Sequence, residues 1–464
     1  MQNQTKIMTF IILVIAFCQD IYSQQSLDAY IFNADSNKFV VVANAANSLS
    51  SPVDIDFYPD QNKRTFELWI LNQGTVSTGG STVIVSNANK STRTFKYVKD
   101  GNSWHFMSMA SALAFGDSLW ATSADILDAN HSTGRYTGPT LWPSDLSIYG
   151  VVGNPSSSQY NGSHLDMVHQ SPYSKGIAFE KDLVYWVLDG YEGNLKRYDY
   201  VATHEAGGSD HSAASVQVYN EFNFTKHSTL PSHIIIDQER KYLYGCDPVG
   251  KRVFRVDITT GSYQGPLNKI NNEPLAAYDE FTGLDIKDII TTGLTSPVGI
   301  DIYGDRLIVT DNATKEIILY NIIDNYSEVG RIKLSYTANP NIMGVKVGPD
   351  GQIYFADKLN KKVMMIENDK VMVLGANETL KSIINLNAYP NPSKHEWSIN
   401  GNSSNEVLSV NLYNAFGELI KIPIVLQNSR SFAININNQD LRQGIYFLKL
   451  STATNSQSIR LIKE

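Results

Sequence analysis

An internal repeat constrains the fold of this chain more than any other feature of its sequence. Each copy has a short apolar strand that opens on a small residue, then a polar turn, a second strand that ends in Asp, and a third strand with basic and β-branched residues. The clear copies begin at Gly176, His233, Gly299 and Gly344, and two weaker copies begin near residues 112 and 53. The pattern of alternating apolar positions and Asp, Gly and Asn turns predicts three short β-strands in every copy.

One such unit cannot bury both of its faces, so neighbouring units must pack face to face around a ring. Six copies therefore predict an all-β fold with a six-bladed β-propeller. A propeller closes when a strand from the other end of the chain completes the last blade, and we expect residues 27–45 to supply that strand. The residues in excess of the repeat, mainly 124–170 and 260–295, are expected to form loops.

The residue pattern of these strands resembles that of the NHL family of propellers. The segment GIDIYGDRLIVTDNATKEIILYN, residues 299–321, shows the small, apolar and acidic residues of the first strand and the Asp that ends the second. The resemblance covers residues 24–376. It implies the fold and says almost nothing about function.

The N-terminus has the pattern of a secretory signal peptide. Lys6 precedes an apolar run over residues 7–18, and a polar stretch ends at the small residue Ser23, so we expect residues 1–23 to be removed. Cys246 would then be the only cysteine, which excludes an intrachain disulfide. No later apolar stretch is long enough to be a transmembrane segment. The formal charge of −8, without any basic run, argues against nucleic acid and anionic membrane surfaces as partners.

The end of the chain has a different composition. Residues 377–386 are predicted to be a linker, and residues 387–464 to be a small immunoglobulin-like β-sandwich. The segments YPNP (389–392), LYNAFGELI (412–420) and LRQGIYFLKL (441–450) occur in an order that resembles the C-terminal sorting domain of the type IX secretion system. This resemblance implies contact with the secretion machinery, export through the outer membrane, and either release or attachment at the cell surface. The alternative is an ordinary accessory module.

Histidines are concentrated in one part of the predicted propeller. They stand mostly in connections that lead into inner strands, where neutral imidazoles from different blades could meet and bind Zn²⁺, Cu²⁺ or Fe²⁺. Asp166 is two residues from His164, so the two side chains share one face of an extended segment. The predicted metal ligands are His164, Asp166, His169, His204, His211 and His233, with His105 and His131 as further candidates. Glu205 and Asp210 are expected to orient the rings.

His233 is the most specific of these candidates. It occupies the position that Gly176, Gly299 and Gly344 occupy in other repeats, beside the central shaft, where a residue needs little room. We therefore expect its ring to point at the axis and the other histidines to meet it there. The segment PSH at residues 231–233 is similar to the inner-strand P-H positions of the propeller lyase that completes peptide amidation, which implies a metal in the shaft.

The sequence leaves three functions open. The first is a metal-binding propeller with lyase or hydrolase activity. The second is a non-enzymatic extracellular module that binds a glycan, a peptide or a protein, and the third is a structural role at the cell surface. A histidine in a polar loop is commonly a plain loop residue, and no pair here has the i, i+4 spacing of a helical zinc signature.

Overall fold

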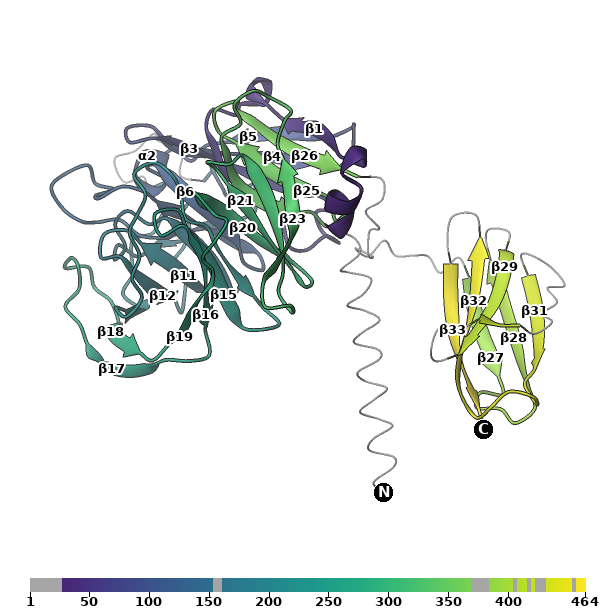
Figure 1. The fold of residues 1–464 in the computed structure, drawn as a ribbon. Helices are drawn as coiled ribbons and strands as arrows, with labels where there is room; N and C mark the ends of the chain where they lie inside the picture. The colour runs from purple at the N-terminus through teal and green to yellow at the C-terminus, as the bar shows by residue number, and fades with distance from the viewer. Residues whose placement is uncertain are drawn as a thin grey trace. The chain divides into compact units, whose positions relative to one another are not determined.

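The computed structural model describes residues 27–152, 161–368, 384–403, 407–414, 419–421, 431–452 and 456–464. The predicted signal peptide lies outside these residues, as does most of the predicted linker. The chain divides into two compact units, residues 1–376 and residues 377–464, each of which is described by itself (Figure 1). Among the described residues, no helix has both the length and the apolar character that crossing a membrane requires.

The described part of the first unit contains six antiparallel blades. From the inside outward, blade 1 contains β2 (Pro52–Phe57), β3 (Leu68–Thr75), β4 (Gly79–Ser86) and β5 (Thr94–Val98). Blade 2 contains β6 (Ala110–Phe115), β7 (Leu119–Ala124), β8 (Thr140–Pro143) and β9 (Asp166–Met167). Blade 3 contains β10 (Gly176–Lys181), β11 (Val184–Asp189), β12 (Asn194–Asp199) and β13 (Ser215–Tyr219). Blade 4 contains β14 (Ile234–Asp237), β15 (Tyr242–Asp247), β16 (Arg252–Asp257) and β19 (Asp285–Ile290). Blade 5 contains β20 (Pro297–Tyr303), β21 (Arg306–Asp311), β22 (Glu316–Asn321) and β23 (Ser327–Lys333). Blade 6 contains β24 (Ile342–Val347), β25 (Ile353–Asp357), β26 (Lys362–Glu367) and β1 (Lys38–Ala43). The first strands of the blades contact one another in a closed ring, β2–β6–β10–β14–β20–β24–β2. The fold is a six-bladed β-propeller, as the repeats predicted.

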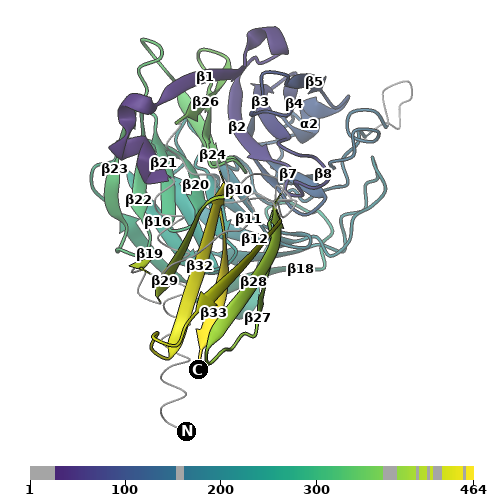
Figure 2. The same ribbon diagram turned by 90° about the vertical axis from the view of Figure 1, so that its right-hand side faces the viewer.

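The ring closes with a strand from the N-terminal end. β1 pairs antiparallel with β26, and both views show purple β1 beside green β26 (Figures 1 and 2). This confirms the closing strand predicted within residues 27–45, although residues 27–32 are helical rather than extended. Asp28 in this helical turn binds Arg306 of blade 5 through Oδ1 and Oδ2, at 2.7 and 2.8 Å. Two short 3-10 helices flank β1, η1 (Ala34–Ser36) and η2 (Ala45–Asn47).

The recurring residues of the blades have structural roles. Trp69 of blade 1 packs on Trp120 of blade 2, with ring centroids 5.1 Å apart, because each sheet is apolar on the faces that meet its neighbours. The acidic residue of the inner strands ties neighbouring blades together: Asp54 accepts a hydrogen bond from the backbone N–H of Leu113 at 2.9 Å, which satisfies an unpaired strand edge. The Asp that ends the second strand, such as Asp189, accepts hydrogen bonds from N–H groups of the following turn.

The segment 260–295 is not a plain loop, contrary to prediction. It contains β17 (Ser262–Pro266) and β18 (Ala277–Thr282), and β18 pairs in parallel with β13, so blade 3 has six strands. The outer edge of β13 offers unpaired N–H and C=O groups, and the hairpin satisfies them. The segment 124–170 likewise contains β8 and the short edge strand β9, and one helical turn, α2 (Ser103–Phe106), precedes β6.

The second unit is a β-sandwich, as predicted. One sheet contains β27 (Ile384–Tyr389), β28 (Glu396–Ser403) and β31 (Ser431–Asn437), and the other contains β30 (Leu419–Ile420), β29 (Val407–Asn414), β32 (Gly444–Thr452) and β33 (Ser456–Lys463). Side chains of both sheets, including Trp397, Ile434, Leu448 and Leu461, form its apolar core.

Candidate metal centre

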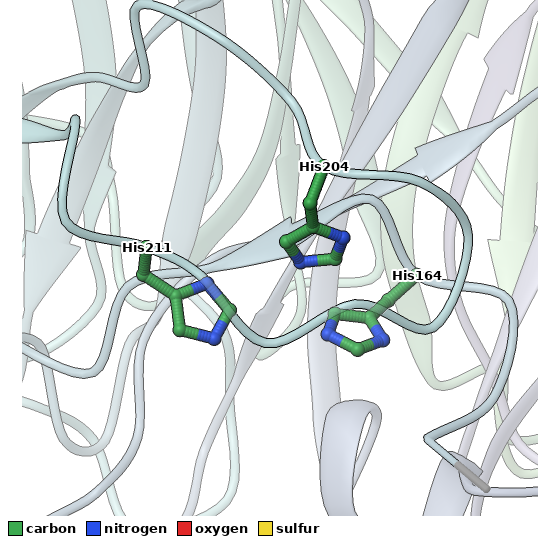
Figure 3. Close-up of side chains that lie close together, drawn as sticks. All are labelled: His164, His204 and His211. Carbon is green, nitrogen blue, oxygen red and sulfur yellow. The ribbon is translucent and has the colours of Figure 1, made fainter.

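Three histidines meet at one point in the propeller. The ligand nitrogens of His164, His204 and His211 all lie within 4.8 Å of one another. Figure 3 shows the three rings turned toward a common centre. His164 lies just before the edge strand β9 of blade 2, while His204 and His211 lie in the connection between β12 and β13 of blade 3. The centre therefore lies between the outer parts of two neighbouring blades.

The prediction that the histidines meet on the propeller axis is wrong. His233 precedes the inner strand β14, and both of its ring nitrogens are used there: Nε2 lies 3.1 Å from the carbonyl oxygen of Ser111, and Nδ1 lies 3.4 Å from Oδ1 of Asp54. It does not join the other three. The repeats locate the inner strands reliably, but the connections that carry His204 and His211 follow paths that the repeat does not define.

Buried polar contacts hold the backbone beside His164. The carboxylate of Asp100 is buried, and its Oδ2 accepts hydrogen bonds from the backbone N–H of Ser163 at 2.7 Å and from the Ser163 hydroxyl at 2.6 Å. Burial raises the pKa of Asp100, and the hydrogen bonds from Ser163 oppose that rise. The residue before His164 is thus fixed by two bonds to one side chain.

Two backbone hydrogen bonds hold the connection 204–211 against the segment that carries His164. The backbone N–H of His204 donates to the carbonyl of Leu165 at 3.2 Å, and that of Gly207 donates to the carbonyl of His164 at 2.9 Å. Gly208 has no room for a side chain, since a Cβ there would lie 2.6 Å from Nδ1 of His204. The Gly-Gly pair therefore lets the loop fold tightly over the ring of His204.

Hydrogen bonds also set the protonation of the three rings. The nearest partner of each Nδ1 is an acceptor oxygen, which favours the tautomer with the hydrogen on Nδ1 and the lone pair on Nε2. At His211 the 2.7 Å contact with Asp166 is shorter than the 3.4 Å contact from the backbone N–H of Met167. The acceptors are the carbonyl of Asn161 for His164 at 2.8 Å, the carbonyl of Glu205 for His204 at 2.6 Å, and Oδ1 of Asp166 for His211 at 2.7 Å. In this state Nε2 of each ring is available to a ligand, and Asp166 orients the ring of His211 through Nδ1.

The environment shifts the pKa values of two of the rings, His164 and His211, in opposite directions. Burial lowers the pKa of His164 well below its usual value, and the neighbouring His204 adds to this. The ring of Phe106 stacks on His164 with centroids 3.7 Å apart and excludes water from that side. Burial also lowers the pKa of His211, but the hydrogen bond and charge of Asp166 outweigh it, so the net pKa of His211 is raised.

One ring nitrogen of this centre has no partner in the described part of the chain. Nε2 of His204 is buried and makes no hydrogen bond. A buried acceptor left in this state costs on the order of 1–3 kcal/mol. A ligand bound at this nitrogen would remove that cost.

Two further histidine rings, those of His169 and His105, lie next to the three-histidine centre. His169 approaches His211 with ring centroids 5.9 Å apart, and His105 approaches His169 at 5.8 Å. Nδ1 of His169 is 2.6 Å from Oε1 of Glu273, and Nδ1 of His105 is 2.9 Å from the carbonyl of Ala129. Burial lowers the pKa of His105 to about 4, with a contribution from the charge of His169.

The remaining candidates lie outside this group of five histidines. His131 is exposed, and its Nε2 lies 2.8 Å from the carbonyl of Trp104. Asp210 was expected to orient a ring, but its Oδ1 accepts from the backbone and hydroxyl of Ser212. Glu205 contributes its carbonyl rather than its carboxylate. Glu273 was missed because it lies in the β17–β18 hairpin, and no pattern near it in the sequence indicates that it meets His169.

Comparison with known proteins bears on both units. Residues 387–464 match the family described as the secretion system C-terminal sorting domain. A search of the curated proteins finds no significant match. The fold of the chain is similar to an auxiliary nutrient binding protein from Bacteroides ovatus (12% identity, 69% of this chain and 70% of that chain, TM-score 0.44). It is also similar to one from Bacteroides thetaiotaomicron (11%, 71% and 76%, 0.46) and to the WD40 β-propeller domain of Doa1 (11%, 72% and 98%, 0.38).

The matched residues include β28 to β33 and the end of β27. Residues 387–464 are therefore a secretion system sorting domain, and the chain is a secreted β-propeller protein that the type IX secretion system exports.

Proposed function

We propose that the propeller binds one transition-metal ion through Nε2 of His164, His204 and His211. The observation that supports this most is the shared state of the rings: each Nδ1 is tied to an oxygen, and each Nε2 is left for a ligand. The buried Nε2 of His204 adds to it, since protein interiors rarely leave such an atom unsatisfied. Neutral imidazoles suit zinc, copper and iron.

A set of three histidines also favours reaction chemistry over a purely structural ion. Structural zinc sites are closed by four protein ligands, whereas catalytic sites keep one position for water or substrate. An ion held in this way lowers the pKa of bound water and polarises a carbonyl, so the proposal extends to a hydrolase or lyase. The strand pattern of the blades favours an NHL-type propeller as the scaffold, a fold that by itself points to no one activity.

Zinc binding to the purified protein tests the proposal. Apo protein prepared with a chelator is titrated with Zn²⁺ by calorimetry, and bound zinc is measured after desalting. We expect one zinc per chain in the wild type and none in His204→Ala or His211→Ala. His131→Ala is the matched control, since this exposed histidine is outside the centre, and it retains the zinc. A wild-type chain that binds no stoichiometric zinc, copper or iron overturns the proposal.

A further inference from the structure

The geometry points to a second metal position, formed by His105 and His169 beside the three-histidine centre. This inference rests on the proposed function, because it makes the centre binuclear. The ring centroids of His105 and His169 are 5.8 Å apart and their planes are inclined by 55°, so the two rings are close neighbours. Nδ1 of each ring is used by an oxygen, which leaves both Nε2 atoms to a ligand.

His169 is held in a fixed orientation by the β17–β18 hairpin, which extends the sheet of blade 3. Glu273 binds this residue twice, through Nδ1 at 2.6 Å and through the backbone N–H at 2.7 Å. Gln170 bonds the same hairpin, because its side chain donates to Asn271 at 2.7 Å and accepts from the N–H of Ile270 at 2.8 Å. Nε2 of His169 is nevertheless buried and has no hydrogen-bond partner among the described residues. The hairpin thus orients a ring whose second nitrogen is unused.

The second ring comes from a different element. His105 lies in α2, and its ring and that of Phe106 are nearly perpendicular, with centroids 4.5 Å apart and planes at 87°. Phe106 also stacks on His164. One buried phenyl ring therefore packs against a histidine of each position, and the ring centroids of His211 and His169 are 5.9 Å apart. The two positions are close neighbours with separate ligands.

The donor set favours copper in the second position. It consists of two imidazole nitrogens, since the carboxylate of Glu273 is used by Nδ1 and the backbone of His169. Among divalent first-row ions, Cu²⁺ binds a given set of nitrogen ligands most tightly. Zinc takes four ligands in most sites, so two histidines alone hold it poorly. Zinc should thus occupy only the three-histidine centre, while copper should fill both.

Copper titration of the full chain tests this inference. Apo protein is loaded with Cu²⁺, desalted and analysed for metal, and the Cu(II) signal is recorded by electron paramagnetic resonance. We expect two coppers per wild-type chain and a signal broadened by coupling between neighbouring ions. His105→Ala and His169→Ala should each bind one copper and give the narrow spectrum of an isolated ion. His131→Ala is the control and should keep both ions.

The outcomes separate this inference from the proposed function. If the wild type binds one copper that His204→Ala removes and His169→Ala does not, the second position is refuted and the three-histidine centre stands. If the wild type binds no zinc, copper or iron, both fail. Glu273→Gln covers the case in which His169→Ala does not fold. This variant keeps a hydrogen-bond acceptor for the ring and should weaken only the second copper, by roughly tenfold or more. An unchanged affinity for both ions in Glu273→Gln contradicts the role of the hairpin.

Discussion

Asp166 offers the sharpest test of the three-histidine centre, through the substitution Asp166→Asn. Its Oδ1 accepts the Nδ1 hydrogen of His211 at 2.7 Å, and its side chain is only 2% exposed. Asparagine has nearly the same shape and can still accept this hydrogen bond through its amide oxygen. The substitution therefore removes the negative charge behind the ring and leaves the packing almost unchanged. A loss of affinity would report on electrostatics rather than on a disrupted loop.

The expected loss follows from the role of the carboxylate. A carboxylate that orients a ligating histidine typically improves metal affinity by about 10–100-fold, which corresponds to about 1.4–2.7 kcal/mol. The effect should depend on pH in a defined direction. Asp166 raises the pKa of His211, so a proton competes with the metal in the wild type as the pH falls through that raised value. In Asp166→Asn the ring loses its proton more readily, so the difference in affinity between the two proteins should shrink toward low pH.

Zinc calorimetry at several pH values, with a competing chelator where binding is tight, measures this difference. Asp210→Asn is the matched control, because Asp210 is adjacent to His211 in sequence but bonds Ser212. It should leave the affinity for zinc unchanged. Equal zinc affinities for Asp166→Asn and the wild type at high pH would refute the reasoning. So would a difference that grows as the pH falls.

Three other changes test the site and the scaffold. Gly208→Ala places a methyl group 2.6 Å from Nδ1 of His204, so zinc affinity in calorimetry should fall by roughly tenfold or more, with an unchanged circular dichroism spectrum. Asp28→Ala leaves the buried guanidinium of Arg306 unpaired and should lower the free energy of unfolding by about 3–5 kcal/mol in urea titrations; a loss below 1 kcal/mol contradicts this. The folded apo protein resists protonation of His105, whose pKa is about 4, so its stability should fall as the pH drops from about 6.5 toward 4. His105→Gln should reduce this loss of stability between pH 7 and pH 5, as measured by urea titrations at the two pH values.

The candidate site could be predicted only in part. His164, His169, His204 and His211 were recognisable as candidates because histidines are rare elsewhere in the chain and these stand near acidic and glycine residues. His233 was predicted on a sound argument about its inner-strand position, yet there its two nitrogens bond Ser111 and Asp54. A position in a repeat tells where a residue lies in a blade, but it does not tell what faces it across the shaft.

Glu273 shows the opposite case. It is 104 residues from His169 in sequence, and the two meet because β18 adds to the free edge of β13. That pairing depends on an unoccupied strand edge in another blade, which no local pattern in residues 260–295 reveals. The orientation of His169, on which the proposed second metal position depends, is therefore visible only in the folded chain.

The sequence by itself determined the propeller, its closing strand and the sorting domain. These features depend on local alternation of apolar residues, on turn residues and on repetition, all of which are properties of short segments. The tertiary structure alone decided which histidines meet, and where. His164 and His211 belong to different blades, and their distance depends on how two irregular connections pack against each other. Long-range packing of this kind is not encoded in any short segment, so the ring nitrogens converge between two outer strands rather than on the axis.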